Sequence, residues 1–277
     1  MNEKHSTPAP EALDSYLRTA IRAAREAARI QLAEKGSDLE IQVKSSDIDL
    51  VTRVDALCEQ SIRRIIGEAH PDHVVMGEEM GQSASGDKRW IVDPLDGTVN
   101  YAHGFPCYCV SIALELDGVI VVGVVYDPER DELFSAVKGR GAFLNGRPLA
   151  VSRTSDTRSA LLATGFAYVE ERILLNLEVF ARVLPQVQAV RRPGAAALDL
   201  CYVACGRSDG FWELGLNPWD VAAAWLLVQE AGGTVTGNGS APYRLGDQAL
   251  IASNGHLHAK LIDLLDLEPV LARWPQE

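Results

Sequence analysis

The sequence contains no long hydrophobic run, and this absence excludes one class of protein. No window approaches about eighteen consecutive apolar residues, so we expect no membrane-spanning helix. The first residues, Met1 to Ser6, also lack an apolar segment of signal-peptide length. We therefore expect a cytoplasmic protein with no membrane partner.

Cysteine pairs with zinc-binding spacing are absent as well. The chain has five cysteines, and no two of them form a Cys-x-x-Cys pair, which argues against structural zinc. An odd number of cysteines without a secretory leader is typical of reduced thiols in a cytoplasm. These cysteines are Cys58, Cys107, Cys109, Cys201 and Cys205.

Positive charge is scarce. The 26 Lys and Arg residues against 38 Asp and Glu residues give a net charge of −12. This balance argues against a protein that binds nucleic acid through phosphate contacts. Arg63-Arg64 and Arg191-Arg192 are the notable basic pairs, too few for a binding stripe. Part of the acidity fits a cation site, because a metal ion neutralises clustered carboxylates.

The chain of 277 residues is long enough for one large domain or two small ones. Its first part predicts a tail over 1–9, two amphipathic helices and an antiparallel meander. Its second part alternates strands and helices, and Asn-Gly and Asp-Gly pairs mark tight turns. The expected helices are 11–35, 52–69, 170–184, 195–205, 218–231 and one after 257, and the strands are 74–76, 90–92, 108–116, 119–126, 132–137, 161–164, 189–192, 211–213 and 249–253.

The stretch from Arg89 to Tyr101 carries the strongest chemical signal. Its apolar start, Trp90 to Val92, predicts a buried strand that delivers Asp93 to its end. Pro94 lacks an N–H group, so we expect it to end the strand. Asp96 follows three residues after Asp93, which places two carboxylates close together. The alternative is an ordinary Pro-Asp-Gly turn.

The residues around these two aspartates suit a hard cation. The Leu95 carbonyl lies between them, and carboxylate and carbonyl oxygens are ligands that Mg²⁺ prefers. Gly97 permits a sharp turn, and Thr98 is expected to cap a following helix. Such a helix would direct free N–H groups at an anion held by the metal.

Three further acids stand where they can join this site. Glu78 follows the strand at 74–76, in the same strand-then-acid arrangement as Asp93. Asp55 and Asp220 lie in the first turns of expected helices, where the alternative is that they only compensate the helix dipole. The segment from His70 to His73 also contains metal-ligand types, but a surface turn explains it.

Three blocks of this sequence resemble the inositol monophosphatase family. The segment Asp93 to Thr98, followed by Asn100 to Pro106, resembles the first signature of that family. The segment from Pro218 to Ala224, continuing to Gly233, resembles the second, and Gly77 to Glu79 is a third match. The blocks stand in the family's order, and the likeness covers about 44–254.

The resemblance implies a fold and an activity. The fold is α+β, a layered α/β/α/β/α sandwich with largely antiparallel sheets, as in fructose bisphosphatase-like proteins. It implies one phosphatase domain over 1–277, with lobes of roughly 10–150 and 151–277, and a homodimer. The activity is a Mg²⁺-dependent phosphomonoesterase that hydrolyses inositol monophosphate or a related polyol or sugar phosphate.

The resemblance also assigns roles to individual residues. Two or three Mg²⁺ ions are held by the metal ligands Glu78, Asp93, Leu95, Asp96 and Asp220. In the family, Asp93 bridges the ions, and Thr98 connects the attacking water to Asp55 by a hydrogen bond. The resemblance assigns catalytic roles to Asp55, Thr98 and Glu78. The substrate contacts are Asp96, Gly97, Thr98, Gly194, Ala197 and Glu213. Lys44 matches a family lysine near a mobile loop. Glu79 is expected to contact the metal ligands and not the metal itself.

The sequence departs from the family at Ala195, where a Ser or Thr is usual. The lost hydroxyl weakens the case for inositol phosphate specifically, although a helix start that needs small residues explains the alanine equally well. Fructose 1,6-bisphosphate, histidinol phosphate, NADP and 3′-phosphoadenylate remain alternative substrates. A non-catalytic, transcription-associated regulator with the same fold is the alternative from another functional class.

Overall fold

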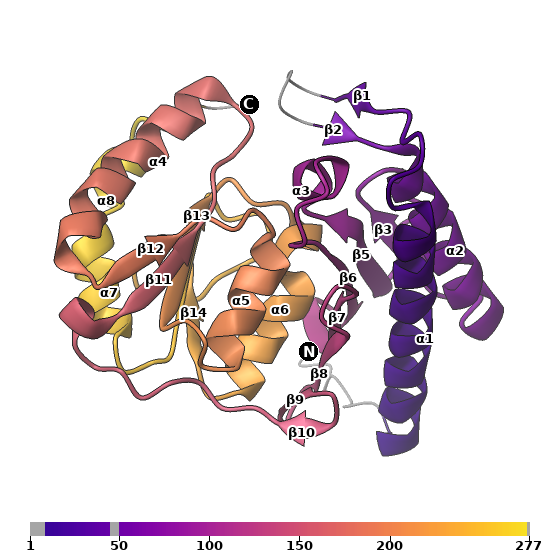
Figure 1. Cartoon of the computed structure of the whole chain (residues 1–277). Coiled ribbons are helices and arrows are strands. Elements are labelled where there is room, and N and C mark those ends of the chain that lie inside the picture. Colours follow the sequence, from indigo (N-terminus) through magenta and orange to yellow (C-terminus); the bar gives the residue numbers. More distant parts are fainter. Residues whose placement is uncertain (1–8, 45–49, 276–277) are drawn as a thin grey trace.

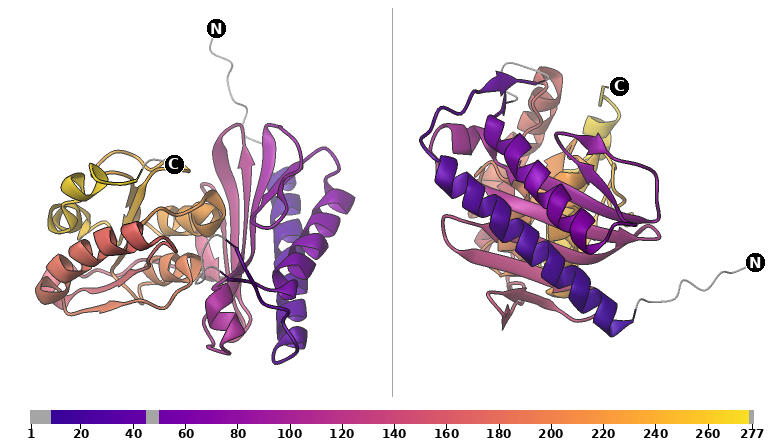
Figure 2. Two further views of the ribbon diagram at one scale, coloured as in Figure 1. Left: turned by 90° about the horizontal axis from the view of Figure 1, so that it is seen from above. Right: turned by 90° about the vertical axis from the view of Figure 1, so that its right-hand side faces the viewer.

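The computed structural model describes residues 9–44 and 50–275, so nearly all of the expected tail lies outside the described residues. The chain forms five layers (Figure 1). Helices α1 and α2 cover an eight-stranded sheet, whose other face packs on α5 and α6. A five-stranded sheet lies on the far side of α5 and α6, and α4, α7 and α8 cover it (Figure 2). The expected α/β/α/β/α sandwich is confirmed.

The outer helices α1 (Pro10–Glu34) and α2 (Arg53–Ala69) pack on each other and on the first sheet. The buried side of α1 is largely alanine, which lets its backbone approach the sheet closely. Its exposed side carries arginines at helical spacing, and Arg64 of α2 joins them around a shallow groove. These arginines, called the arginine stripe below, are Arg18, Arg22, Arg25, Arg29 and Arg64, and three of them pair with Glu26 or Glu68 of the same groove.

The first sheet has the strand order β10-β9-β8-β7-β6-β5-β3-β4 and is antiparallel except between β3 and β5. Its tight turns behave as expected, since Asp117 and Gly118 both adopt positive φ, at 51° and 77°. A short β1–β2 hairpin (Gln42–Val43 and Leu50–Val51) lies beside it. The strands are β3 Val74–Gly77, β4 Gly81–Gln82, β5 Lys88–Asp96, β6 Cys109–Leu116, β7 Val119–Asp127, β8 Glu132–Val137, β9 Ala142–Leu144 and β10 Arg147–Pro148.

The expectation that Pro94 ends its strand is wrong, because β5 continues to Asp96. The ladder to β6 is instead interrupted between Asp93, paired with Ser111, and Asp96, paired with Cys109. The irregularity absorbs the missing N–H of proline. The Pro94 carbonyl accepts a hydrogen bond from Gln31 Nε2 of α1 at 2.8 Å, which satisfies it outside the sheet.

The central helices α5 (Ala196–Ala204) and α6 (Pro218–Glu230) are buried on almost all sides. They belong to one hydrophobic core that also contains residues of both sheets. At Gly123 of β7 an added Cβ would lie 2.4 Å from the Ala223 carbonyl oxygen of α6. The absence of a side chain at Gly123 therefore sets how closely α6 approaches the first sheet.

The second sheet has the order β12-β11-β13-β15-β14 and is mixed rather than largely antiparallel. β11 is parallel to both β12 and β13, because helices α4 and α5 form the connections between them. The strands are β11 Leu161–Thr164, β12 Ala189–Arg191, β13 Gly210–Leu214, β14 Thr234–Thr236 and β15 Ala249–Ser253; the outer helices are α4 Glu170–Val183, α7 His258–Leu265 and α8 Glu268–Leu271.

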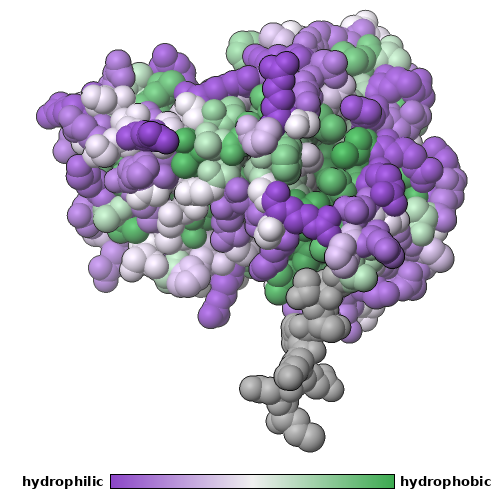
Figure 3. All heavy atoms as spheres, turned by 90° about the horizontal axis from the view of Figure 1, so that it is seen from below, coloured by the Kyte–Doolittle hydropathy of each residue, from purple (hydrophilic) through white to green (hydrophobic). Residues whose placement is uncertain are grey.

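Most large apolar side chains lie between the layers. On the face seen from below, hydrophilic residues occupy most of the outline (Figure 3). Among the described residues, no helix combines the length and the apolar composition that crossing a bilayer requires.

Candidate active site

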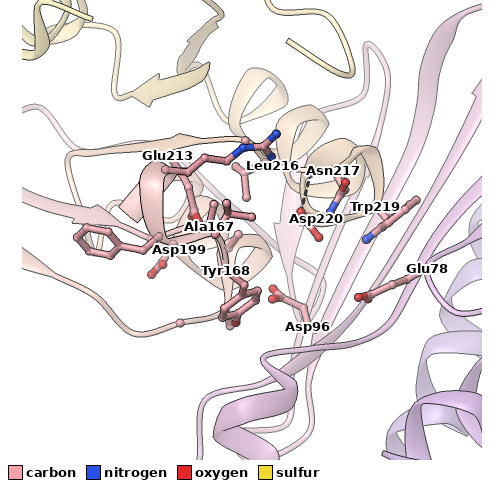
Figure 4. Close-up of a pocket in the computed structure, with 18 of the residues that line it drawn as sticks. Glu78, Asp96, Ala167, Tyr168, Asp199, Glu213, Leu216, Asn217, Trp219 and Asp220 are labelled. Atoms are coloured by element: carbon pink, nitrogen blue, oxygen red, sulfur yellow. Dashed lines mark hydrogen bonds between the residues drawn. The ribbon is translucent and has the colours of Figure 1, made fainter. Parts of the chain in front are cut away.

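A cavity of about 530 Å³ lies between the end of β5, the strand β13 and the start of α6 (Figure 4). Asp96 at the end of β5 forms one part of its wall, and Asp220 in the first turn of α6 forms another. Glu213 of β13 and Tyr168, in the loop before α4, line the opposite side. The cavity is therefore lined by residues from strands of both sheets and from the start of α6.

A smaller cavity of about 70 Å³ lies beside it and collects the predicted metal ligands. Because β3 is parallel to β5, with Gly77 opposite Val92, Glu78 just after the end of β3 lies beside Asp93 of β5. The small cavity is lined by Leu50, Glu78, Asp93, Leu95, Asp96, Gly97, Thr98, Val99, Tyr168 and Asp220. All five predicted ligands are among these residues.

The buried carboxyl groups at this point oppose one another's ionisation. Burial raises the pKa of Asp93 well above its ordinary value, and the charges of Glu78, Asp96 and Asp220 raise it further. Burial likewise raises the pKa of Asp96 to about 7. Burial is also the largest cause of the raised pKa of Asp220. Such a cluster is stabilised by positive charge.

The donor chemistry of the cluster fits a hard divalent cation, because every donor is a carboxylate or carbonyl oxygen. In the described part of the chain, however, no three His, Cys, Asp or Glu side chains are gathered closely enough to hold a metal as they stand. The side chains would have to turn toward a shared point to coordinate an ion.

Lys44 supplies positive charge to the cluster. Its Nζ donates to Glu78 Oε1 at 2.8 Å and also to Glu79 Oε1. Burial alone would lower the pKa of Lys44, but the charges of Glu78 and Glu79 outweigh it and raise the pKa above its ordinary value. Lys44 thus neutralises part of the charge that a metal ion would otherwise neutralise.

Thr98 and Asp55 form a pair beside the metal ligands. Thr98 Oγ1 donates to Asp55 Oδ1 at 3.0 Å and lies 3.0 Å from the Leu95 carbonyl oxygen. The other Asp55 oxygen accepts from the Thr52 N–H at 2.8 Å and the Thr52 hydroxyl at 2.6 Å. Asp55 therefore caps α2 and also contacts Thr98, which lines the small cavity. Burial raises the pKa of Asp55 to about 6.

The expectation that Thr98 caps the following helix is wrong. The helix α3 (Thr98–Ala102) has Gly97 at its N-cap, with φ at 92°, and Thr98 is its first residue. An added Cβ at Gly97 would lie 2.8 Å from the Cys107 carbonyl oxygen. Because glycine occupies the cap, the Thr98 hydroxyl remains available to Asp55.

Asp220 also combines two functions. Its Oδ2 accepts a hydrogen bond from the Asn217 N–H at 2.7 Å, in a capping box at the start of α6. The same carboxyl lines both cavities. Helix-dipole compensation and a place at the site are thus not alternatives here.

The predicted substrate contacts divide into two groups. Gly194, Asp96 and Glu213 line the large cavity, and Gly97 and Thr98 line the small one. Ala197 lines neither, because it is fully buried and its N–H donates to Asp96 Oδ2 at 2.8 Å. The neighbouring Ala196 occupies the cavity wall instead. Burial raises the pKa of Glu213 to about 8.

The histidines of the 70–73 segment belong to an aromatic packing cluster. His70 Nε2 lies 3.0 Å from Thr19 Oγ1, and His73 Nδ1 accepts from Trp90 Nε1 at 3.0 Å. The two imidazole rings stack with their centroids 4.9 Å apart. Neither histidine lines the two cavities, so this segment takes no part in the candidate site.

A model of the "Inositol monophosphatase family" matches residues 12–268. The chain belongs to the inositol monophosphatase family. An inositol-1-monophosphatase of Synechocystis is 42% identical over 97% of this chain and 93% of its own. A Nus factor SuhB of Pseudomonas aeruginosa is 45% identical, over 81% of this chain and 86% of its own length. A solved structure of the extragenic suppressor protein suhB of Bartonella henselae has a TM-score of 0.87 at 38% sequence identity. The match covers 92% of this chain and 99% of that chain.

Two residues of this inositol monophosphatase family member were missed by sequence reasoning. Glu59 of α2 is fully buried and accepts hydrogen bonds from the Glu79 and Met80 N–H groups, so it holds the turn that presents Glu78. Its signal was an acid on the apolar face of a helix. Asp199 of α5 lines the large cavity, and a charged residue within an apolar helix was again the available signal.

Proposed function

We propose that this protein is a Mg²⁺-dependent phosphomonoesterase that hydrolyses inositol monophosphate or a related polyol or sugar phosphate. The observation that carries the proposal is the buried acidic cluster directly beside the Thr98–Asp55 hydrogen bond. Family membership supports a phosphatase, and the name of the Synechocystis relative supports an inositol phosphate substrate.

Each side chain of the cluster then has a defined place. Glu78, Asp93 and the Leu95 carbonyl would hold one ion, and Asp96 and Asp220, with Asp93 as the bridge, would hold a second. Bound Mg²⁺ neutralises phosphate oxygens and lowers the pKa of an attacking water. The set contains no serine, cysteine or histidine nucleophile, so we infer direct hydrolysis by water. Two ions are the minimum, and a third is compatible with the number of carboxylates.

The residues of this chain manage the proton and the phosphate. The Thr98 hydroxyl donates to Asp55 and can in turn accept a hydrogen bond from the attacking water. With a pKa raised to about 6 by burial, Asp55 can take a proton near neutral pH. The N–H groups of Gly97 and Thr98 stand at the start of α3 and would seat the phosphate.

Other phosphomonoesters and another role remain as competing proposals. The motifs alone admit fructose 1,6-bisphosphate, histidinol phosphate, NADP and 3′-phosphoadenylate. Several relatives bear the name Nus factor SuhB, which favours the transcription-associated regulator as the second candidate. The complete acidic cluster favours catalysis, because a protein without catalytic activity has no need to keep buried carboxyls together. We also propose that the protein is a homodimer that acts in the cytoplasm.

A phosphate-release assay over a panel of small monophosphates tests the proposal. We expect release from inositol 1-phosphate with Mg²⁺ and none after thorough chelation. Asp93→Asn should lower kcat by several orders of magnitude, because the bridging ligand loses its charge. Release that persists after chelation, or a variant within about tenfold of wild type, equivalent to roughly 1.4 kcal/mol in the barrier, would contradict the metal mechanism.

A further inference from the structure

A buried acid of helix α2 has no part in the proposed hydrolysis, although it contacts the turn that presents Glu78. Glu59 is 0% exposed. Its Oε2 accepts a hydrogen bond from the Glu79 N–H at 2.8 Å, and its Oε1 accepts one from the Met80 N–H at 3.2 Å. Glu59 therefore fixes the backbone directly after Glu78.

Arg63, one helical turn after Glu59, holds the same segment from its other side. Its guanidinium pairs with Glu59 Oε1 at 2.7 Å and so supplies the counter-charge that a buried acid needs. It also donates to the Val75 carbonyl of β3 at 3.1 Å and to the Gly81 carbonyl of β4. The Glu59–Arg63 pair therefore joins α2 to both strands that enclose residues 78–80.

The close approach of Glu59 depends on the glycine before Glu78. An added Cβ at Gly77 would lie 2.2 Å from Glu59 Oε1 and 2.4 Å from the carboxyl carbon. A side chain at position 77 would therefore displace the carboxyl from the N–H groups that it accepts from. A glycine at such a point allows another group to approach the backbone closely.

A fixed backbone at Glu78 matters for cation binding. In the described part of the chain, no three acidic, His or Cys side chains are gathered closely enough to hold an ion as they stand. With its backbone already fixed, Glu78 needs to order only its side-chain torsions, and less conformational entropy is lost on binding. Groups that orient a ligand without touching the metal contribute roughly 10- to 100-fold to metal affinity.

We propose that Glu59 and Arg63 are positioning residues that set the affinity of the acidic cluster for Mg²⁺ by fixing residues 78–80. This inference rests on the proposed function and assigns part of its metal affinity to residues outside the ligand set. Both residues lie apart from the proton path of Thr98 and Asp55, and neither lines the small cavity. The pair therefore acts on cation binding and leaves hydrolysis at saturating Mg²⁺ unchanged.

Calorimetric titration of the metal-free protein with Mg²⁺ tests the inference on Arg63→Met. Methionine keeps much of the apolar stem of the side chain and removes the guanidinium. The Kd for Mg²⁺ should rise roughly 10- to 100-fold. At saturating Mg²⁺, kcat should stay within about twofold of the wild-type value, because the lost group acts on binding and not on the chemical step.

Arg64→Met is the matched control. Arg64 is the next residue of α2 and forms an ion pair of the same spacing with Glu68, but this pair lies on the exposed face of the helix. The Kd for Mg²⁺ should therefore stay within about twofold of the wild-type value. An equal rise in Kd for both variants, or no rise for Arg63→Met, would overturn the proposal.

Glu59→Gln supplies the same measurement if Arg63→Met does not fold, since Arg63→Met leaves a buried carboxyl without its counter-charge. Glutamine keeps the size of the side chain but has one acceptor oxygen in place of two. We expect a higher Kd for Mg²⁺ and a smaller Mg²⁺-induced rise in Tm. A lower metal-free Tm with an unchanged Kd would show that Glu59 only stabilises the fold, and the proposal would fall.

Cation binding also separates this inference from the proposed function. If wild type and Arg63→Met bind Mg²⁺ equally and wild type hydrolyses inositol 1-phosphate, only the inference fails. If the Kd rises in Arg63→Met and wild type hydrolyses no phosphomonoester, the positioning role stands and the proposed function fails. A wild-type protein that binds no Mg²⁺ would overturn both.

Discussion

At the scale of single residues, Asp55 shows how the two oxygens of one carboxyl group make different contacts. A carboxylate has two oxygens, and here one of them caps α2 through Thr52 while the other accepts from Thr98. Sequence reasoning set these explanations against each other, although the geometry of the group allows both. The same holds for Asp220, which caps α6 and lines the site.

Paired substitutions test whether Thr98 and Asp55 act as a unit. Thr98→Ala and Asp55→Asn should each lower kcat by about 10²–10⁴-fold, the usual contribution of general-base assistance. The double variant should be little worse than either single one, because both remove the same proton path. Steady-state kcat and KM measure this, and fully additive losses would show that the two residues act separately.

Thr52→Ala is the matched control for this pair. It removes the cap hydroxyl of α2 but leaves the Thr98–Asp55 hydrogen bond intact. We expect a loss of about 1 kcal/mol in unfolding free energy and a much smaller change in kcat than for Thr98→Ala. If the loss in kcat were equal, the site would depend on the cap rather than on the proton path.

At the scale of elements, helix α5 begins without a cap of its own. Ala195 occupies the N-cap with no side-chain hydrogen bond, and Asp96 of β5 accepts from the Ala197 N–H instead. The substituted family position is thus a helix start as well as a part of the cavity wall. This observation favours the helix-start explanation of the alanine.

Ala195→Ser should therefore stabilise the protein by about 0.5–2 kcal/mol, because a serine hydroxyl can accept the free N–H groups of the first turn. Denaturant unfolding measures the gain. The kcat/KM values for inositol 1-phosphate and p-nitrophenyl phosphate should change by the same factor. A selective gain on inositol 1-phosphate, without a gain in stability, would instead assign the position to substrate recognition.

At the scale of the whole molecule, charged side chains gather in two regions. The outer face of α1 and α2 carries the arginine stripe together with Glu26 and Glu68, whereas the acids of the candidate site gather around the small cavity. Helices α5 and α6, which both contribute residues to the large cavity, also belong to one hydrophobic core with residues of both sheets. The stability of this region therefore depends on how its buried carboxyls are neutralised.

Without divalent cations, Tm should fall as the pH is raised from about 5 to about 9. The pKa of Asp96 is raised to about 7 and that of Glu213 to about 8, first by burial in each case. A carboxyl whose folded pKa is raised stabilises the fold while it is protonated, and this contribution is lost as the pH rises through the folded pKa. Thermal unfolding of the chelated protein at several pH values measures the slope.

Mg²⁺ should reverse this loss, with its largest effect at the upper end of the pH range. A ligand present at a hundred times its Kd adds about 2.7 kcal/mol to stability. Asp93→Asn should show a much smaller Mg²⁺ effect than wild type. A Tm that Mg²⁺ leaves unchanged at every pH would argue against a cation at this cluster.

The sequence by itself determined most helices and long strands, and it placed the acids at strand ends and helix starts. These features depend on local periodicity and capping, which neighbouring residues specify. It also indicated the family, because the signature blocks are contiguous in the chain. It missed Glu59 and Asp199, because a single acid within a helix has no local pattern that reveals its partners.

Only the tertiary structure decided how these pieces meet. The parallel pairing of β3 with β5, which brings Glu78 beside Asp93, joins strands that the local pattern cannot orient. Strand β5 continues past Pro94, whose carbonyl accepts a hydrogen bond from Gln31 of α1, a helix far away in the sequence. The hydrogen bond from the Ala197 N–H, at the start of α5, to Asp96 joins residues 101 positions apart. Such contacts depend on the packing of whole layers, and local propensity carries no information about them.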